Sequence, residues 1–345
     1  MSKRKPGRAA APPPGAVLMQ MLSGKWISQA LASAVELGIP DQLGKGAKPV
    51  SELAGKAGAS EDGVYRLLRA LASVGVFSEG AGRRFKLTPI GQLLRTDTPG
   101  NHAGYVRFTG HDSTWRPWGQ LTHSVRTGQP AFDLVFGMPV FEYFAKNPDA
   151  SAIFDHAMTS LSAMESHAIA DAYDFKNIGT LMDVAGGHGM LLATLMKKHR
   201  KMKGVLFDLP HVTAGAAATF AKAGVADRVS VASGDFFREL PAGADAIIMK
   251  HIIHDWDDEA SGKILGACHR ALGAKGKLLI AETVVPAGNT PHFGKLLDLE
   301  MLALTPRGRE RTKPEFTALL KASGFRISRI VATHSPISVI EAVKA

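Results

Sequence analysis

The sequence predicts a two-domain α/β protein, with a helical amino-terminal domain and a doubly wound, mostly parallel sheet in the carboxy-terminal half. Three observations predict this fold class. From residue 180 onward, short apolar runs alternate with helical patterns. Residues 181–190 pass from an apolar run through a small-residue turn into a helix start, the place where α/β folds hold a ligand against the backbone. Before residue 100 the pattern is helix, helix, helix and hairpin, which is typical of a winged helix-turn-helix.

The composition is that of a globular protein with a full core. The chain has 345 residues, enough for two domains, and 45% of them are hydrophobic. Its only cysteine, Cys268, can form no intramolecular disulfide, so the sequence predicts a cytoplasmic protein. No apolar run is long enough to span a membrane, and the amino terminus lacks the apolar core of a signal peptide. We therefore expect no membrane association.

Residues 1–15 are predicted to form a disordered tail, because they are basic and rich in alanine and proline. Lysine and arginine at positions 3, 4, 5 and 8 supply four charges of a net charge of +10. The rest of the chain is then only mildly basic, so its charge is weak support for a polyanionic partner.

We place the winged-helix domain at residues 16–100. Helical patterns cover residues 17–37 and begin again at Ser51 and Ser60, and short β-runs at residues 76–77 and 85–87 predict a hairpin. The last of these helices has one apolar stripe, which we expect to be buried: Val64, Leu67, Leu68, Leu71 and Val74.

A winged helix invites a DNA-binding interpretation, in which this same helix would contact the bases. Its outward positions include Glu61, Asp62 and Ala70, with only Arg66 and Arg69 as cations. A base-contacting helix is normally richer in basic and amide side chains. We therefore favour a packing or dimerisation domain over one that binds nucleic acid.

Residues 101–175 are expected to be mostly helical, and their aromatic and methionine side chains suit either a core or an apolar pocket. Residues 176–345 form the predicted sheet domain, with helices between the first six strands and an antiparallel pair at one edge. The predicted strands are 181–184, 205–207, 229–232, 246–249, 277–281, 326–332 and 338–342.

A cofactor site is predicted at the ends of the first three strands. Gly187 and Gly189 allow a ligand close to the backbone, and Asp208 follows roughly 20 residues later, where an acid can bind both ribose hydroxyls. Asp235 and Phe236 follow the third strand and suit an adenine amino group and ring. Each acid has a plain alternative, since acids at strand ends also cap helices or close turns.

The loop also excludes two common cofactor classes. The third glycine of a dinucleotide fingerprint is missing after Gly189, and no Gly-Lys-Ser/Thr follows as in a P-loop. The sequence therefore predicts a nucleoside cofactor without a pyrophosphate.

The reaction is predicted to depend on the segment after the fourth strand, residues 250–259. His251 and His254 are three apart and could suggest a metal, but no H-E-x-x-H motif or cysteine cluster accompanies them, so we predict no metal site. A histidine just past the carboxyl end of a sheet strand lies where α/β enzymes bind ligands. Its pKa near neutrality suits a general base, and we assign that role to His254.

At this point the chain resembles a known family, the S-adenosylmethionine-dependent O-methyltransferases of the caffeic-acid and hydroxyindole type, including bacterial relatives that make natural products. The resemblance spans residue 17 to the carboxyl terminus. The matching runs, in order, are residues 141–143, 154–158, 183–189, 207–210, 234–236, 250–256, 281–282 and 308–312. The His-Asp-Trp and Gly-Arg-Glu-Arg-Thr segments are the specific ones. The chain departs from the glycine-richer form of the loop at Ala185.

The resemblance implies a fold, a cofactor and partners. The fold would be a class I methyltransferase domain, Rossmann-like, whose seven-stranded sheet has an antiparallel edge strand, after a winged-helix dimerisation domain. The cofactor would be S-adenosylmethionine. The partners would be an aromatic small molecule and a second copy of the chain, bound through the amino-terminal helices with their apolar stripe at Met19, Leu22 and Trp26.

The resemblance also implies roles for individual residues. His254 would be the base, with Glu282 and Glu310 flanking and orienting it. Asp208 would bind the ribose, Asp235 and Phe236 the adenine, and Lys250 the cofactor through its backbone. Trp256 would pack on the adenine, and Ser162 would lie near the methionine end. The implied acceptor pocket consists of Phe154, Met158, Met301 and Leu302, although apolar residues at helical spacing also suit a core.

Two other functions stay open at this point. One is a relative that keeps the cofactor but has changed its reaction, to N-methylation or hydroxylation. The other is a winged-helix regulator with a vestigial ligand domain. The presence of His254, Glu282 and Glu310 together favours retained base chemistry, and hence O-methylation of a phenolic hydroxyl.

Overall fold

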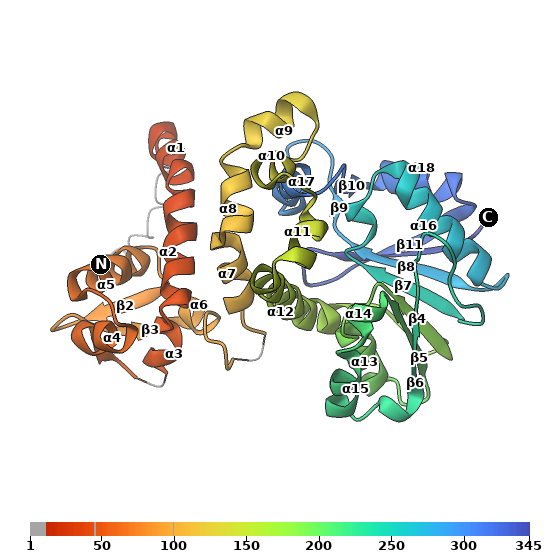
Figure 1. The fold of residues 1–345 in the computed structure, drawn as a ribbon, viewed down its shortest axis with the longest axis horizontal. Helices are drawn as coiled ribbons and strands as arrows, with labels where there is room; N and C mark the ends of the chain where they lie inside the picture. Colours follow the sequence, from red (N-terminus) through yellow and green to blue (C-terminus); the bar gives the residue numbers. More distant parts are fainter. Residues whose placement is uncertain (1–11, 45, 99) are drawn as a thin grey trace, which may run out of the picture. The chain divides into compact units, whose positions relative to one another are not determined.

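A computed structural model describes residues 12–44, 46–98 and 100–345 (Figure 1). The chain divides into two compact units, residues 1–111 and 112–345. Most of the predicted tail, up to residue 11, lies outside the described residues, and the first helix begins at Pro14.

The first unit is built of helices around a small antiparallel sheet. The predicted hairpin is confirmed, and a two-residue strand adds a third member in the order β1-β3-β2. The helical stretch predicted at residues 17–37 is divided between two helices, because helix α1 ends before Ser23 and a new helix begins after it. The elements are α1 (Pro14–Leu22), α2 (Gly24–Glu36), α3 (Ile39–Leu43), β1 (Lys48–Pro49), α4 (Val50–Ala57), α5 (Glu61–Ser73), β2 (Phe77–Gly80), β3 (Arg84–Leu87), α6 (Pro89–Gln92) and α7 (Ala103–Gly110).

The amphipathic pattern of α5 fixes how it packs. The hydroxyl of Ser60 accepts a hydrogen bond from the backbone N–H of Gly63 and caps the helix. Val64, Leu68 and Leu71 are buried in the core of this unit. Val74, the last residue of the predicted stripe, is instead 43% exposed, because the helix ends at Ser73.

The second unit contains the predicted seven-stranded sheet, in the order β11-β12-β8-β7-β4-β5-β6. Neighbouring strands are parallel except around β12, which runs antiparallel to both β8 and β11. The antiparallel pair at one edge is thus confirmed, with the reversed strand second from the edge. The strands are β4 (Thr180–Val184), β5 (Lys203–Asp208), β6 (Val229–Ser233), β7 (Ala246–Lys250), β8 (Lys277–Glu282), β11 (Phe325–Ala332) and β12 (Ser338–Lys344).

The strand order places a topological switch at β4. From β4 the chain continues to β5 and β6 on one side, and then crosses to β7 and β8 on the other. In open α/β sheets, ligands bind where the order reverses, at the carboxyl ends of the strands. The loops after β4, β5 and β7 meet this description, and they carry the predicted site.

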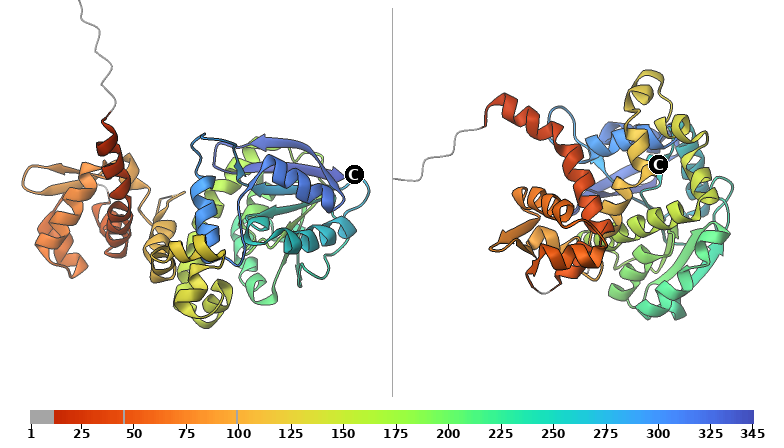
Figure 2. Two further views of the ribbon diagram at one scale, coloured as in Figure 1. Left: turned by 90° about the horizontal axis from the view of Figure 1, so that it is seen from above. Right: turned by 60° about the vertical axis from the view of Figure 1, so that its left-hand side comes forward.

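Helices cover both faces of the sheet (Figures 1 and 2). Successive strand residues alternate between two hydrophobic cores, so that Leu181 packs with one set of helices and Met182 with the other. The first core includes α12 (Pro148–Ala172), α13 (Met190–Lys198) and α15 (Ala216–Ala223), and the second includes α16 (Asp258–Ala271) and α18 (Lys313–Ala322).

One expected helix does not form. A helix is predicted between each pair of the first six strands, but residues 234–245 contain only turns and irregular backbone between β6 and β7. Gly234, Pro241 and Gly243 interrupt this segment, and each residue type disfavours a helix interior.

Residues 101–175 are mostly helical, as predicted, and from residue 112 onward they belong to this second unit. An aromatic cluster joins three of these helices, because Phe132 contacts Tyr143 and Phe144, and Phe144 stacks on Phe154 with ring centroids 4.8 Å apart. Among the described residues, no helix is long and apolar enough to cross a membrane. The remaining helices of this unit are α8 (Asp112–Trp118), α9 (Leu121–Thr127), α10 (Ala131–Phe136), α11 (Val140–Lys146), α14 (Pro210–Thr213) and α17 (Gly294–Leu304).

Candidate active site

The two glycines of the loop after β4 serve different purposes. Gly189 has φ +76°, and a Cβ there would lie 2.3 Å from the ring of Phe220, so this glycine is required for α13 to pack. Gly187 has φ +59° with open space where a Cβ would be. Of the two, only Gly187 leaves room for a ligand beside the backbone. Ala185 also has a positive φ, of +54°, a conformation that usually selects glycine.

Two carboxylates stand beside this loop. Asp208, at the end of β5, accepts hydrogen bonds from the backbone N–H groups of Gly187, at 2.8 Å, and Leu209, at 2.7 Å. Asp183, near the end of β4, is fully buried, and its Oδ2 has no hydrogen-bond partner among the described residues. Burial raises the pKa of Asp183 to about 7.

Asp183 was not assigned a role from the sequence. The sequence nevertheless indicates a role for Asp183, because an acid inside an otherwise apolar strand must be paired or functional. The carboxylate also constrains the loop, since a Cβ at Gly186 would lie 2.6 Å from it.

Asp235 and Phe236 lie in the turn after β6. The carboxylate of Asp235 accepts a hydrogen bond from the N–H of Phe237, at 2.9 Å, and its other oxygen lies 3.7 Å from Arg238. Trp256 contacts this turn, with its ring centroid 6.2 Å from that of Phe236 and 4.8 Å from that of Phe237. The structure therefore brings three predicted cofactor residues together.

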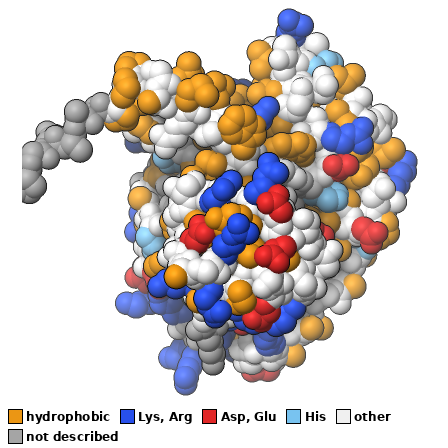
Figure 3. Space-filling view, turned by 90° about the vertical axis from the view of Figure 1, so that its left-hand side faces the viewer, with side chains coloured by type: hydrophobic (Ala, Val, Ile, Leu, Met, Phe, Trp, Pro, Cys, Tyr) orange, Lys and Arg blue, Asp and Glu red, His pale blue; other side chains and the backbone are white. Residues whose placement is uncertain are grey.

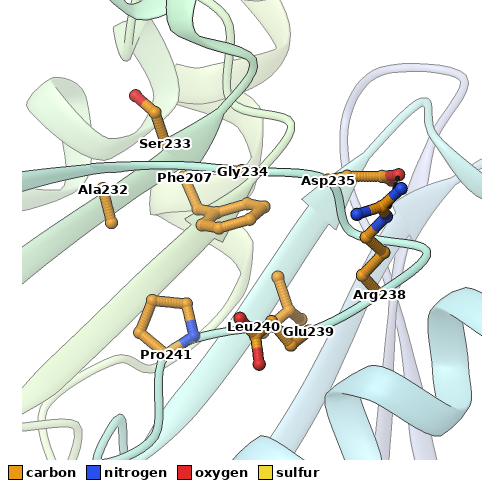
Figure 4. Close-up of a pocket in the computed structure, with 9 residues that line it drawn as sticks. All are labelled: Phe207, Ala232, Ser233, Gly234, Asp235, Arg238, Glu239, Leu240 and Pro241. Atoms are coloured by element: carbon orange, nitrogen blue, oxygen red, sulfur yellow. Dashed lines mark ion pairs between the residues drawn. The ribbon is translucent and has the colours of Figure 1, made fainter.

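A half-open groove of about 740 Å³ adjoins this turn (Figure 4). The ring of Phe207 points toward Leu240 and Pro241, and Asp235 and Arg238 lie at one end. His254 is not part of the lining, so the groove is separate from the predicted base.

The predicted base is held by a single carboxylate. His254 lies in the short turn after β7 and is only 7% exposed. Its Nδ1 lies 2.7 Å from Oε1 of Glu310. Because a carboxylate can only accept, Nδ1 carries a hydrogen, and in the neutral form of the ring the lone pair is therefore on Nε2. Among the described residues, the carboxylate recorded closest to Nε2 is that of Asp255, at 3.6 Å, which is too long for a hydrogen bond.

Glu282, predicted to flank the imidazole, contacts the backbone of the same turn. Its Oε1 accepts from the N–H groups of Ile252, Ile253 and His254, at 3.1, 2.6 and 3.3 Å. Its second oxygen is buried without a partner among the described residues. Glu282 therefore shapes the turn that carries His254, whereas Glu310 holds the ring.

The segment 308–312 fastens this turn from the other side. The guanidinium of Arg311, 1% exposed, donates to the carbonyl oxygens of Ile253, at 2.9 Å, and Trp256, at 2.8 Å. The N–H of Arg309 donates to the carbonyl of His254, at 2.7 Å. A Cβ at Gly308 would lie 2.7 Å from that carbonyl, which explains the glycine. From the sequence we expect Arg311 to lie in a solvated loop with Arg307, Arg309 and Lys313, and its burial contradicts this expectation.

The carboxylates determine the protonation of His254. Burial alone would lower its pKa, but the negative charges of Asp255, Glu310 and Glu282 outweigh it and raise the pKa of His254 to about 10. Burial in turn raises the pKa of Asp255 to about 6, and it raises the pKa of Glu282.

Two helices carry the predicted acceptor residues, and one of them also carries Ser162, which was predicted to lie near the methionine end of the cofactor. Phe154, Met158 and Ser162 lie on α12, which also carries the buried Glu165. The carboxylate of Glu165 lies 3.2 Å from the ammonium of Lys250 and 2.9 Å from Nε2 of His251, directly before the His254 turn.

Met301 and Leu302 lie on α17. From the same helix, the carboxylate of Asp298 accepts a hydrogen bond from the N–H of Glu310, at 2.8 Å. Met301 is buried and Leu302 half-buried. Both helices are therefore tied to the residues that surround His254.

Two protein-family models match the chain. Residues 19–97 match the model described as the O-methyltransferase dimerisation domain, and residues 118–326 match the O-methyltransferase domain. A phenazine O-methyltransferase, PhzM, from Lysobacter antibioticus is 43% identical over 97% of this chain and 98% of its own length.

Solved structures are similar over the same length. The crystal structure of LaPhzM has a TM-score of 0.90 at 42% identity and covers 96% of this chain and 100% of that one. NcsB1, an O-methyltransferase from neocarzinostatin biosynthesis, was solved with S-adenosylmethionine and 2-hydroxy-5-methyl naphthoic acid. It has a TM-score of 0.77 at 32% identity, covering 92% of this chain and 96% of that one.

Proposed function

The chain belongs to the S-adenosylmethionine-dependent O-methyltransferase family, and from that premise we propose that it methylates a phenolic hydroxyl of an aromatic small molecule, with His254 as general base. The observation that carries the assignment is the pairing of His254 Nδ1 with Glu310 in a buried turn, because this pairing puts the lone pair of the neutral ring on Nε2. Acid–imidazole pairs of this kind fix the tautomer and stabilise the charged ring once it has taken a proton.

The residues around the loops fit the cofactor. The free Oδ2 of Asp183 and the carboxylate of Asp208 are acceptors for its amino and hydroxyl groups, and the open space at Gly187 admits it beside the backbone. Asp235, with Phe236 and Trp256, offers an acceptor and aromatic surface for its adenine. When bound, S-adenosylmethionine supplies a methyl group already activated by its sulfonium charge.

The protein then has two tasks. It must hold the acceptor oxygen in line with the methyl group, and alignment of this kind is worth effective molarities of about 10⁵ M or more. It must also remove the hydroxyl proton, which Nε2 of His254 accepts while Glu310 stabilises the resulting imidazolium. General base catalysis adds roughly 10² to 10⁴ in rate.

The predicted acceptor residues on α12 and α17 suit an aromatic acceptor. Phe154 extends the aromatic cluster of α10 and α11 onto α12, and Met158 lies one turn further along the same helix. Aromatic and sulfur side chains favour the faces and edges of planar rings. We propose that these residues, with Met301 and Leu302 from α17, form the acceptor pocket.

The pH dependence of the reaction follows from the pKa of His254. The base acts in its unprotonated form, and the carboxylates place its pKa above the usual 6.5, at about 10. We therefore expect kcat/KM to rise with pH along a limb that lies above pH 6.5. Asp255→Asn should move this limb to lower pH, because it removes a negative charge beside the ring. Measuring kcat/KM between pH 6 and 10 for the wild type and for Asp255→Asn, with an acceptor phenol that does not ionise in this range, checks both expectations. A kcat/KM that does not change with pH contradicts the role of His254 as base.

We also propose that the chain forms a homodimer through α1 and α2. These helices expose large apolar side chains, which gather at the upper left of Figure 3. Contiguous exposed apolar surface of this kind marks interaction sites. The residues are Leu18, Met19, Met21, Leu22 and Trp26, with 56–71% of each exposed.

The double variant Leu22→Asp, Trp26→Asp should then be monomeric at concentrations where the wild type sediments as a dimer, because it places two charges in the apolar contact. Val231→Asp, at an exposed apolar position of β6, is the matched control and should stay dimeric. A wild type that sediments as a monomer would overturn the proposal.

A screen of phenols with methyl-labelled S-adenosylmethionine tests the proposed function. We expect a product heavier than the acceptor by about 14 Da per event, the mass that one methyl group adds. A product methylated on nitrogen, or a hydroxylated product, contradicts phenol methylation. Phenol methylation is also contradicted if no planar acceptor of one to three rings yields a methylated phenol.

A further inference from the structure

A second groove lies at the end of the large sheet opposite the predicted cofactor site. It is half-open, has a volume of about 420 Å³ and is formed by residues 175–179 and 199–202. These segments lead into the amino ends of the parallel strands β4 and β5, whereas Asp208 and His254 lie at or after the carboxyl ends of strands. The groove is therefore separate from the proposed active site, and its size is typical of a site for one small molecule.

Basic side chains line this groove. The run 197–203, Lys-Lys-His-Arg-Lys-Met-Lys, has a basic residue at six of its seven positions. Arg200 and Lys201 form one wall, Lys176 belongs to the other, and all three are exposed. Among the ion pairs of the described residues, the one in this region joins Lys198 to Asp171, at 2.8 Å, and none involves the three cations of the groove.

Basic residues at the end of a helix have a simpler explanation, because they complement the helix dipole. That explanation covers Lys197 and Lys198, which lie in the last turn of α13. It does not cover Arg200, Lys201 or Lys176, which lie outside any helix. The positive charge of the groove itself therefore needs another reason.

A further cation holds one wall of the groove in place. The guanidinium of Arg228, directly before β6, donates to the carbonyl oxygens of Met196, His199 and Met202, at 3.2, 3.3 and 2.9 Å. All three acceptors are uncharged, so they leave the positive charge of Arg228 in place. The turn is thereby fixed before any ligand binds, which lowers the entropic cost of binding.

His199 reports on the charge in the groove. It lines the groove, and its Nε2 is buried without a hydrogen-bond partner among the described residues. Burial and the positive charges of Lys198 and Lys176 lower the pKa of His199, while the charge of Asp174 opposes them. Asp174 also accepts a hydrogen bond from the N–H of Lys176, at 3.1 Å. An anion bound in the groove would favour the charged form of this imidazole.

We propose that this groove binds a small molecule through its phosphate group, at a site separate from that of the reaction. A phosphate monoester carries about 1.5 to 2 negative charges near pH 7, and arginine and lysine are its usual partners. The side-chain amide of Asn177 adds a neutral donor to the lining. Single-stranded nucleic acid fits less well, because the aromatic residue here, Phe175, is fully buried and cannot stack on a base.

Calorimetry of the full chain with inorganic pyrophosphate and with ribose 5-phosphate tests this site. The double variant Arg200→Gln, Lys201→Gln should bind each ligand at least about tenfold more weakly than the wild type, because it removes two charged donors. Lys313→Gln, Lys321→Gln removes two exposed cations of α18 instead, and this matched control should bind as the wild type does.

Two further measurements locate the ligand. In protein with carbon-labelled histidine, the NMR titration midpoint of His199 should rise by about half a pH unit or more when pyrophosphate saturates the protein. The kcat of methyl transfer should stay at the wild-type value in both double variants, because the groove lies apart from His254.

Affinity for both ligands supports a phosphorylated organic molecule, and affinity for pyrophosphate alone supports a free inorganic phosphate. Equal affinities in the two double variants, a Kd for both ligands weaker than about 10 mM, or an unmoved His199 midpoint would overturn the proposal. A DNA duplex that binds more tightly than either ligand, and loses affinity in Arg200→Gln, Lys201→Gln, would also overturn it, because the surface would then serve a polymer.

Discussion

His254→Gln is expected to lower kcat by about 10² to 10⁴ while leaving the affinity for S-adenosylmethionine nearly unchanged. The variant removes the lone pair that accepts the hydroxyl proton. Its amide N–H can still donate to Glu310, so the buried carboxylate keeps a partner and the fold is preserved. An alanine would instead leave Glu310 unpaired, and loss of stability would obscure the kinetic effect.

Steady-state kinetics and calorimetry separate the two effects for this variant. The kinetics give kcat and KM for the acceptor, and calorimetry gives Kd for the cofactor. Glu259→Gln, at an exposed acid in the first turn of α16, is the matched control and should behave as the wild type. A His254→Gln enzyme with wild-type kcat would show that alignment alone accounts for the rate.

Asp208→Ala is expected to weaken binding of S-adenosylmethionine by about 10²- to 10⁴-fold. The carboxylate is a charged acceptor for two ribose hydroxyls in the proposed complex, and hydrogen bonds to charged groups contribute about 1.5–3 kcal/mol each. It also accepts from the N–H groups of Gly187 and Leu209, so its loss loosens the loop that faces the cofactor. Both effects lower the affinity for the cofactor and do not involve the acceptor directly.

Calorimetry with S-adenosylhomocysteine and S-adenosylmethionine measures the change in Kd. Asp227→Ala, an exposed acid before β6, provides a control with the same change of side chain. Asp208→Asn keeps one acceptor oxygen, so its Kd should lie between that of Asp208→Ala and that of the control. Wild-type affinity in Asp208→Ala removes this residue from the site.

Most of the fold could be predicted from local patterns in the sequence. The ends of the seven strands lie within two residues of the predicted ones, because buried parallel strands are short apolar runs bounded by turn residues. The missing helix at residues 234–245 shows the limit of this approach. A strict alternation of strands and helices was expected here, although Gly234, Pro241 and Gly243 locally disfavour a helix.

The site was less predictable, because its contacts join distant parts of the chain. The pairing of His254 with Glu310 links residues 56 apart, and only the order of motifs pointed to it. Nothing local indicated that Glu282 would bond to backbone N–H groups. Glu165 lies 86 residues before His251 on a helix whose pattern looked like ordinary core. Burial and charge balance at such positions depend on how the elements meet in space.

The most direct test of the central claim is to locate the transferred methyl group. Wild type and His254→Gln would each be incubated with carbon-13 methyl-labelled S-adenosylmethionine and a phenolic acceptor, and the product examined by NMR. We expect one labelled methyl group bonded to the phenolic oxygen, formed at least about 100-fold more slowly by the variant. A methyl group on nitrogen or carbon, or equal rates in the two proteins, would contradict base-assisted O-methylation by His254.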